Sequence, residues 1–179
     1  MFAGYMMQQQ KKWRFFLLLV GCVLVLDQGT KLYIHHTFML HESRPVVADF
    51  FHLTYVRNSG AAFGLLARQN ATFLRLFFPA VTLFAVVILL LYFQHTPRQR
   101  VLTLSGICLI IGGAIGNGID RLWLGQVIDF LDVFWQTYHW PAFNVADSAI
   151  CVGVGCLLLD AFLHPAPSPV AADADHGTR

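Results

Sequence analysis

Residues 71–93 read ATFLRLFFPAVTLFAVVILLLYF, and this stretch decides the fold class. A helix that crosses a bilayer needs about 20 mostly apolar residues, and here only Arg75 and Pro79 interrupt the apolar run. Two later stretches, 101–119 and 142–163, meet the same requirement. The sequence therefore predicts at least three membrane-spanning helices.

The composition of the whole chain agrees with this prediction. Of 179 residues, 56% are hydrophobic and 12% are charged, whereas a soluble domain carries about 25% charged residues. A soluble domain of this length has no room to bury so much apolar surface. The formal net charge is +2 and no extended basic patch occurs. These features exclude a soluble enzyme, a disordered chain and a nucleic-acid binder.

Residues 15–34 predict a further span, although Asp27 and Lys31 lie within it. A competing interpretation is a cleavable secretory signal, because basic residues at 11–14 precede a short apolar run that reaches a lipoprotein-like cleavage box at Cys22. The apolar run continues beyond Cys22, so a cut there would fall inside the helix. We therefore expect four spans, with the first one retained.

Four spans place both termini on the same side of the membrane. Lys and Arg near span ends favour the cytoplasm, and they occur at 11–14 and again at Arg98 and Arg100 between the second and third spans. We expect one membrane domain, residues 1–163, with both termini in the cytoplasm and a disordered cytoplasmic tail at 164–179. Segment 35–70 then lies on the outer side.

This outer segment is more than a linker. Residues 49–56, DFFHLTYV, alternate in the way that is typical of a strand, and Gly60 and Gly64 suggest turns after it. The predicted fold class is an all-α integral membrane protein with four transmembrane helices and a small extracytoplasmic β-sheet between helices 1 and 2.

Polar side chains gather at the outer ends of the predicted spans. Ionisable residues inside spans are costly, so each is a functional candidate. Only Asp160 lies towards the cytoplasmic side, whereas a transport pathway needs polar groups across the whole bilayer. The pattern favours chemistry at the outer boundary. The outer group comprises Asp27, Lys31, Arg75, Asn117, Asp120, Arg121, Asn144 and Asp147.

Simpler roles exist for several of these residues. Asp27 and Lys31 stand at i and i+4, which suits an ion pair on one helix face, and Asp120 beside Arg121 suits an interfacial ion pair. The glycines at 112–116 suit close helix packing. No HExxH or other ligand spacing predicts a metal site. The four cysteines lie in apolar stretches, where we expect buried structural thiols.

Asp129 and Asp147 suggest a particular chemistry. Both lie in apolar contexts, VIDFLDVF and FNVADSA, and Asp132 follows the first of them. Two carboxylates held close in a dehydrated site cannot both ionise easily, so one keeps a proton while the other can take a proton from water. This is how an aspartic protease works. Spacing in the sequence does not show whether the two side chains meet.

Five stretches of the sequence, taken in order, resemble lipoprotein signal peptidase, the signal peptidase II family of bacteria. They are LDQGTK at 26–31, YVRNSGAAF at 55–63, GGAIGNGIDR at 112–121, GQVIDF at 125–130 and PAFNVADS at 141–148. Each motif is weak alone, but five in the same order are specific.

The resemblance implies an aspartic endopeptidase of the bacterial inner membrane, with its active site at the periplasmic face and a short surface helix over it. Such an enzyme removes the signal peptide from prolipoproteins that carry a diacylglyceryl group on a cysteine, and cuts immediately before that cysteine. It needs no cofactor, contacts membrane lipids and is expected to act as a monomer. The resemblance makes Asp129 and Asp147 the catalytic pair. The supporting and substrate-binding residues are Asp27, Lys31, Asn58, Gly60, Asn117, Arg121 and Asn144.

Two rival classes stay open at this point. A small transporter would need polar residues in the inner half of the membrane and often internal repeats, and the sequence shows only Asp160 and no repeat. A non-catalytic scaffold that binds lipoprotein precursors would use the same polar layer without cutting. An Asp→Asn substitution separates the scaffold from the peptidase.

Overall fold

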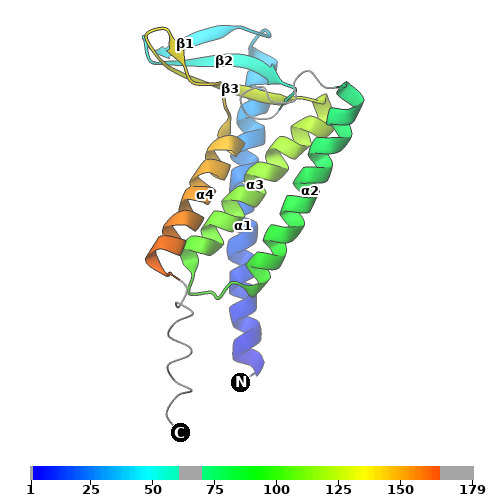
Figure 1. Cartoon of the computed structure of the whole chain (residues 1–179), viewed down its shortest axis with the longest axis vertical. Coiled ribbons are helices and arrows are strands. Elements are labelled where there is room, and N and C mark those ends of the chain that lie inside the picture. Colours follow the sequence, from blue (N-terminus) through cyan, green and yellow to red (C-terminus); the bar gives the residue numbers. More distant parts are fainter. Residues whose placement is uncertain (1, 61–69, 166–179) are drawn as a thin grey trace, which may run out of the picture.

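The computed structural model describes residues 2–60 and 70–165, and Figure 1 shows four helices with a sheet across one end. The helices are α1 (Phe2–Thr37), α2 (Ala71–His95), α3 (Val101–Leu124) and α4 (Val145–Leu163). All four are long and apolar enough to cross a membrane, which confirms the predicted spans. The expected surface helix, the turn at Gly64 and the tail from residue 166 lie outside the described residues.

Several helix boundaries differ from the prediction. Helix α1 starts before residue 15, because the Gln and Lys residues that precede the apolar run are also good helix formers. It continues past residue 34 to Thr37. Helix α3 continues past residue 119 to Leu124 and ends at Gly125, whose φ of 73° is the left-handed conformation common after a helix. Helix α4 begins at Val145 rather than at 142, because Asn144 caps it.

Helix α3 is the centre of the bundle and contacts the other three helices. Its glycines allow the close approach that the sequence predicted. A Cβ atom on Gly106 would lie 2.7 Å from the carbonyl oxygen of Gly153 in α4, and one on Gly112 would lie 2.9 Å from Val23 in α1. Helix α2 packs mainly on α3 and meets α1 near Phe93, and most of its surface faces outwards.

The sheet is built from both connections on the same side of the bundle. Its strands are β1 (Ser43–Val47), β2 (Phe51–Asn58), β3 (Val127–Trp135) and β4 (Tyr138–His139), all antiparallel in that order. The strand expected near 49–56 is β2. The sequence analysis missed β3 and β4, which lie between α3 and α4. Strand β3 is largely buried on both faces and therefore shows no alternating pattern.

Two apolar clusters hold the molecule together. One joins α1, α2 and α3 around Phe16, Phe93 and Ile107, and the other seats the sheet on α1 through Ile34, Tyr55 and Ile128. At the end of the bundle away from the sheet, Asp160 forms a 2.8 Å ion pair with Arg100 and accepts a hydrogen bond from Thr103. The inner carboxylate noted in the sequence thus joins α4 to α3.

Candidate active site

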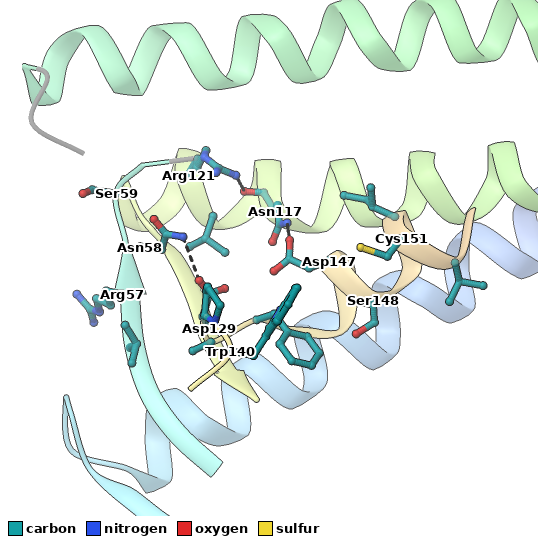
Figure 2. A pocket seen from close by; sticks show the side chains of 17 residues that line it. Arg57, Asn58, Ser59, Asn117, Arg121, Asp129, Trp140, Asp147, Ser148 and Cys151 are labelled. Carbon is teal, nitrogen blue, oxygen red and sulfur yellow. Dashed lines mark hydrogen bonds between the residues drawn. The ribbon is translucent and has the colours of Figure 1, made fainter. Parts of the chain in front are cut away.

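Asp129 and Asp147 line the same cavity, below the sheet and beside α3 and α4 (Figure 2). The cavity has a volume of about 1060 Å³. Three more of the predicted site residues, Asn58, Asn117 and Arg121, also line it. The fold therefore brings together two carboxylates that the sequence left unconnected.

Asp129 lies on β3 and is almost completely buried, with 3% of its surface exposed. One carboxylate oxygen accepts a 2.8 Å hydrogen bond from the Asn144 side chain, and the other accepts a 3.2 Å bond from Asn58. Burial raises the pKa of Asp129 to about 7, and the negative charge of Asp147 adds to this effect. The two amide hydrogen bonds and the charge of Lys31 oppose the rise.

Asp147 lies in the first turn of α4, where a capping box fixes it. The Asn144 side-chain oxygen accepts a 2.9 Å hydrogen bond from the Asp147 backbone N–H, and Asp147 accepts one of 3.2 Å from the Asn144 backbone N–H. Asn117 donates to the other Asp147 oxygen over 2.8 Å. Asn144 therefore contacts both carboxylates, Asp129 through its side-chain amide and Asp147 through the cap.

Beneath the cavity lies a buried charged triad of Lys31, Asp27 and Asp120. The Lys31 ammonium lies 2.8 Å from Asp27 and 2.9 Å from Asp120, and it donates a further 2.9 Å hydrogen bond to the Asn117 side-chain oxygen. Asp27 accepts from the backbone of Ala146 at the start of α4. The i, i+4 ion pair is confirmed, and neither Asp27 nor Lys31 lines the cavity.

The expected ion pair between Asp120 and Arg121 is wrong. Asp120 points towards Lys31 and accepts from the Ile128 backbone N–H, because successive residues of a helix face different directions. Arg121 instead donates to the carbonyl oxygens of Gly60, at 3.2 Å, and Asn117, at 3.4 Å. Its Nε is buried with no hydrogen-bond partner among the described residues, and its guanidinium lies over the Phe78 ring.

Gly60, the remaining predicted residue, lies two residues after the end of β2. Its backbone N–H donates to the Asn58 side-chain oxygen over 2.9 Å, which leaves the Asn58 amide free to face Asp129. Gly60 thus takes part through its backbone, with its N–H on Asn58 and its carbonyl on Arg121.

Some residues have other positions than the sequence suggested. Asp132 pairs with His139 at 2.9 Å on the outside of β3 and does not line the cavity. Of the cysteines expected to be buried, Cys108 is buried, whereas Cys22 and Cys151 are exposed. Cys151, Ser148 and Trp140 line the cavity and were missed. Cys151 stands four residues after Asp147, so helical spacing was the signal that could have found it.

Comparisons with known proteins show the family to which the chain belongs. The family model described as Signal peptidase (SPase) II matches residues 19–163. A lipoprotein signal peptidase of Syntrophotalea carbinolica is 53% identical over 83% of this chain and 91% of its own length, and that of Geobacter metallireducens is 50% identical over 83% and 90%.

Solved structures give the same result. A bacterial membrane enzyme determined by the in meso method at 2.3 Å resolution has a TM-score of 0.74 and 32% identity, over 83% of this chain and 87% of that one. A second bacterial membrane enzyme determined by the in meso method, at 1.9 Å resolution, has a TM-score of 0.73, also with 32% identity, over 85% of this chain and 94% of that one. With a family match that spans all four helices and relatives near half identity, the chain belongs to the signal peptidase II family of multi-pass bacterial membrane peptidases.

Proposed function

We propose that this chain is an aspartic endopeptidase that removes signal peptides from lipoprotein precursors, with Asp129 and Asp147 as its catalytic pair. The observation that carries the proposal is one cavity lined by two carboxylates, with Asn144 hydrogen-bonded to both. The raised pKa of Asp129 gives the pair a proton to share near neutral pH. The relatives that bear the name lipoprotein signal peptidase support the choice of substrate.

The proposed mechanism uses one proton and one water molecule. The pair shares one proton, which in the proposed starting state is carried by Asp129, whose pKa is raised to about 7. Asp147 faces the donors from Asn117 and Asn144. Asp147 takes a proton from water as the water oxygen attacks the scissile carbonyl carbon, and Asp129 donates a hydrogen bond to the carbonyl oxygen. The tetrahedral intermediate then collapses, and the proton on Asp147 passes to the leaving amine.

The walls of the cavity suit a lipid-modified substrate. A cavity of about 1060 Å³ is at the upper end of the range for small-molecule sites, and Trp140, Phe143 and Val152 give it an apolar wall. Burying each CH₂ of an acyl chain is worth about 0.8 kcal/mol. We propose that the diacylglyceryl group on the substrate cysteine binds against this wall, so that the bond before that cysteine reaches the aspartates.

The orientation in the membrane follows from charge. Lys11, Lys12, Arg98 and Arg100 lie at the end of the bundle opposite the sheet. Because Lys and Arg favour the cytoplasm, we propose that the sheet and cavity lie at the periplasmic face of the inner membrane, with both termini in the cytoplasm. The protein is proposed to act as a monomer in contact with membrane lipids, without a cofactor.

The test is cleavage of a diacylglyceryl-modified precursor by purified protein in detergent. Wild type is compared with Asp129→Asn and Asp147→Asn, and with Asp132→Asn as a matched carboxylate outside the cavity. We expect the first two variants to fold and lose cleavage, and the third to keep it. Near-normal cleavage by either cavity variant would refute the aspartate pair, and a wild type that binds the precursor without cutting it would support the scaffold instead.

A further inference from the structure

The hairpin of β3 and β4 carries three exposed aromatic side chains on one face. Trp135 is 74% exposed, Tyr138 81% and Trp140 59%. Trp135 and Tyr138 are directly opposite in the antiparallel ladder, so their side chains lie on the same face. The Trp140 backbone N–H donates to Val133, which continues the ladder, and Trp140 stands two residues after Tyr138. Alternation along a strand therefore places Trp140 on that face too.

The opposite face of the hairpin makes ring contacts with neighbouring strands of the sheet. The Phe134 ring lies 4.6 Å from the His139 ring in a stacked arrangement and 4.7 Å from that of His52. His139 also pairs with Asp132. The hairpin thus has one face that stabilises the sheet and one aromatic face, defined by Trp135, Tyr138 and Trp140, that projects outwards.

The segment that carries the aromatic face has no charged residue. Residues 133–146 contain no Lys, Arg, Asp or Glu, whereas the β1 side of the sheet carries an exposed ion pair between Glu42 and Arg44. Trp and Tyr combine an apolar ring with a polar atom and concentrate at the level of the lipid headgroups. Three such rings with no charge beside them suit this layer better than bulk water.

The aromatic face is also continuous with a surface that faces lipid. Trp140 lines the cavity together with Cys151 and Val152 of α4, and Val152 is exposed on a helix long enough to span the membrane. Figure 1 shows the sheet lying across the end of the bundle where α4 begins. The apolar surface therefore runs from the hairpin, past the mouth of the cavity, onto the outer surface of α4.

We propose that the aromatic face is a membrane anchor that lies in the headgroup layer of the leaflet on the sheet side. The anchor fixes the height of the sheet above the bilayer, beside the entrance of the cavity. The occupant of this face is lipid, rather than a second copy of the chain or a protein partner. The assignment is independent of the proposed peptidase mechanism, because it concerns only where the hairpin lies.

The test uses tryptophan fluorescence in vesicles of phosphatidylethanolamine and phosphatidylglycerol. Trp13→Phe, Trp123→Phe and Trp140→Phe together leave Trp135 as the sole tryptophan. Two further proteins add Trp135→Phe to these three substitutions. One of them also carries Tyr138→Trp, on the aromatic face, and the other carries His139→Trp, on the opposite face. Quenching is measured with lipids brominated near the ester end, with lipids brominated near the methyl end, and with aqueous iodide.

We expect ester-end bromines to quench positions 135 and 138 severalfold more than methyl-end bromines do, with weak quenching by iodide and weaker lipid quenching at 139. Strong iodide quenching without lipid quenching would place the face in water and overturn the proposal. The face could instead be protected from both quenchers, with a protection that disappears as the protein is diluted in lipid. This result would assign the face to a contact with a second copy and would also overturn the proposal. If the triple variant does not fold, the difference between wild type and Trp135→Phe isolates Trp135.

Discussion

Lys31 donates a 2.9 Å hydrogen bond to the side-chain oxygen of Asn117, and this contact determines which end of the Asn117 amide faces Asp147. A lysine ammonium can only donate, so the amide oxygen must face it and the amide N–H must face the carboxylate. The buried triad under the cavity is therefore connected to one of the two candidate catalytic groups through a single side chain.

Lys31→Met should impair both stability and catalysis. The substitution leaves the carboxylates of Asp27 and Asp120 buried without their cation, and removing one partner of a buried ion pair costs roughly 3–5 kcal/mol. It also frees the Asn117 amide to turn. We expect a lower unfolding temperature in detergent and a lower kcat for the fraction that folds, measured with the lipid-modified precursor.

Lys12→Met is the matched control for this prediction. Lys12 is a second buried lysine, and its ammonium donates to the carbonyl oxygens of Gln94 and Thr96 at the end of α2, far from the cavity. It should lower stability and leave kcat per folded molecule near the wild-type value. A similar fall of kcat in both variants would mean that Lys31 acts through stability alone.

Asn144 allows its capping role to be separated from its contact with Asp129. Ser caps a helix N-terminus nearly as well as Asn, whereas Ala costs about 1 kcal/mol. Both Asn144→Ser and Asn144→Ala remove the amide that donates to Asp129. We expect Asn144→Ser to unfold at a higher temperature than Asn144→Ala.

The two Asn144 variants should nevertheless lose catalysis to the same extent. A hydrogen bond to a neutral group is worth about 0.5–1.5 kcal/mol, which corresponds to roughly twofold to tenfold in rate. Steady-state kinetics on the precursor would measure this loss. Recovery of kcat in Asn144→Ser would show that the cap alone matters and that the amide does not position Asp129.

Much of this architecture was predictable from the sequence, because its causes are local. Apolar length predicts the spans, and i, i+4 spacing predicts the contact of Asp27 with Lys31. The proximity of Asn58 to Asp129 has a different origin, since it depends on the pairing of β2 with β3, in which Val56 stands opposite Asp129. A strand such as β3 that is largely buried on both faces has no alternating pattern in its sequence, so its pairing with a distant strand cannot be read from the sequence. Only the resemblance to a family linked these residues beforehand.

Gly113→Ala should destabilise the contact between α3 and α4. A Cβ atom at Gly113 would press on the backbone carbonyl of Ala146, and backbone cannot move aside as a flexible side chain can. Overpacking of this kind costs about 1–3 kcal/mol, and it displaces the turn that carries Asp147. We expect a lower unfolding temperature together with a lower kcat.

Gly155→Ala is the control for the glycine at 113. A Cβ atom at Gly155 meets nothing within 4 Å, and Ala is favoured over Gly in a helix by about 0.5–1 kcal/mol. Its unfolding temperature should stay level or rise slightly. If Gly113→Ala behaved in the same way, the close packing of α4 on α3 would not be needed for the site.

The pH dependence of cleavage should reflect the shared proton of the aspartate pair. The pKa of Asp129 is raised to about 7, so the folded protein keeps this proton while an unfolded Asp loses it near pH 4. Between these values the native state binds more protons, and its stability therefore falls as the pH rises towards 7. Cleavage should also decrease as the pH rises above about 7, because Asp129 then loses the proton that the pair shares.

Asn58→Ala tests which titrating group causes the fall in cleavage at alkaline pH, the alkaline limb of the pH profile. The Asn58 amide donates to Asp129 and favours its ionised form, so removing it should raise the pKa of Asp129 further and move the limb to higher pH. The measurement is kcat against pH, with Ser59→Ala as a neighbouring cavity substitution that makes no such hydrogen bond to Asp129. A limb that stays in place in Asn58→Ala, or that moves equally in Ser59→Ala, would mean that another group carries the titration. A shift confined to Asn58→Ala would assign the limb to Asp129, because Asn58 is the side chain that donates to that carboxylate from the sheet.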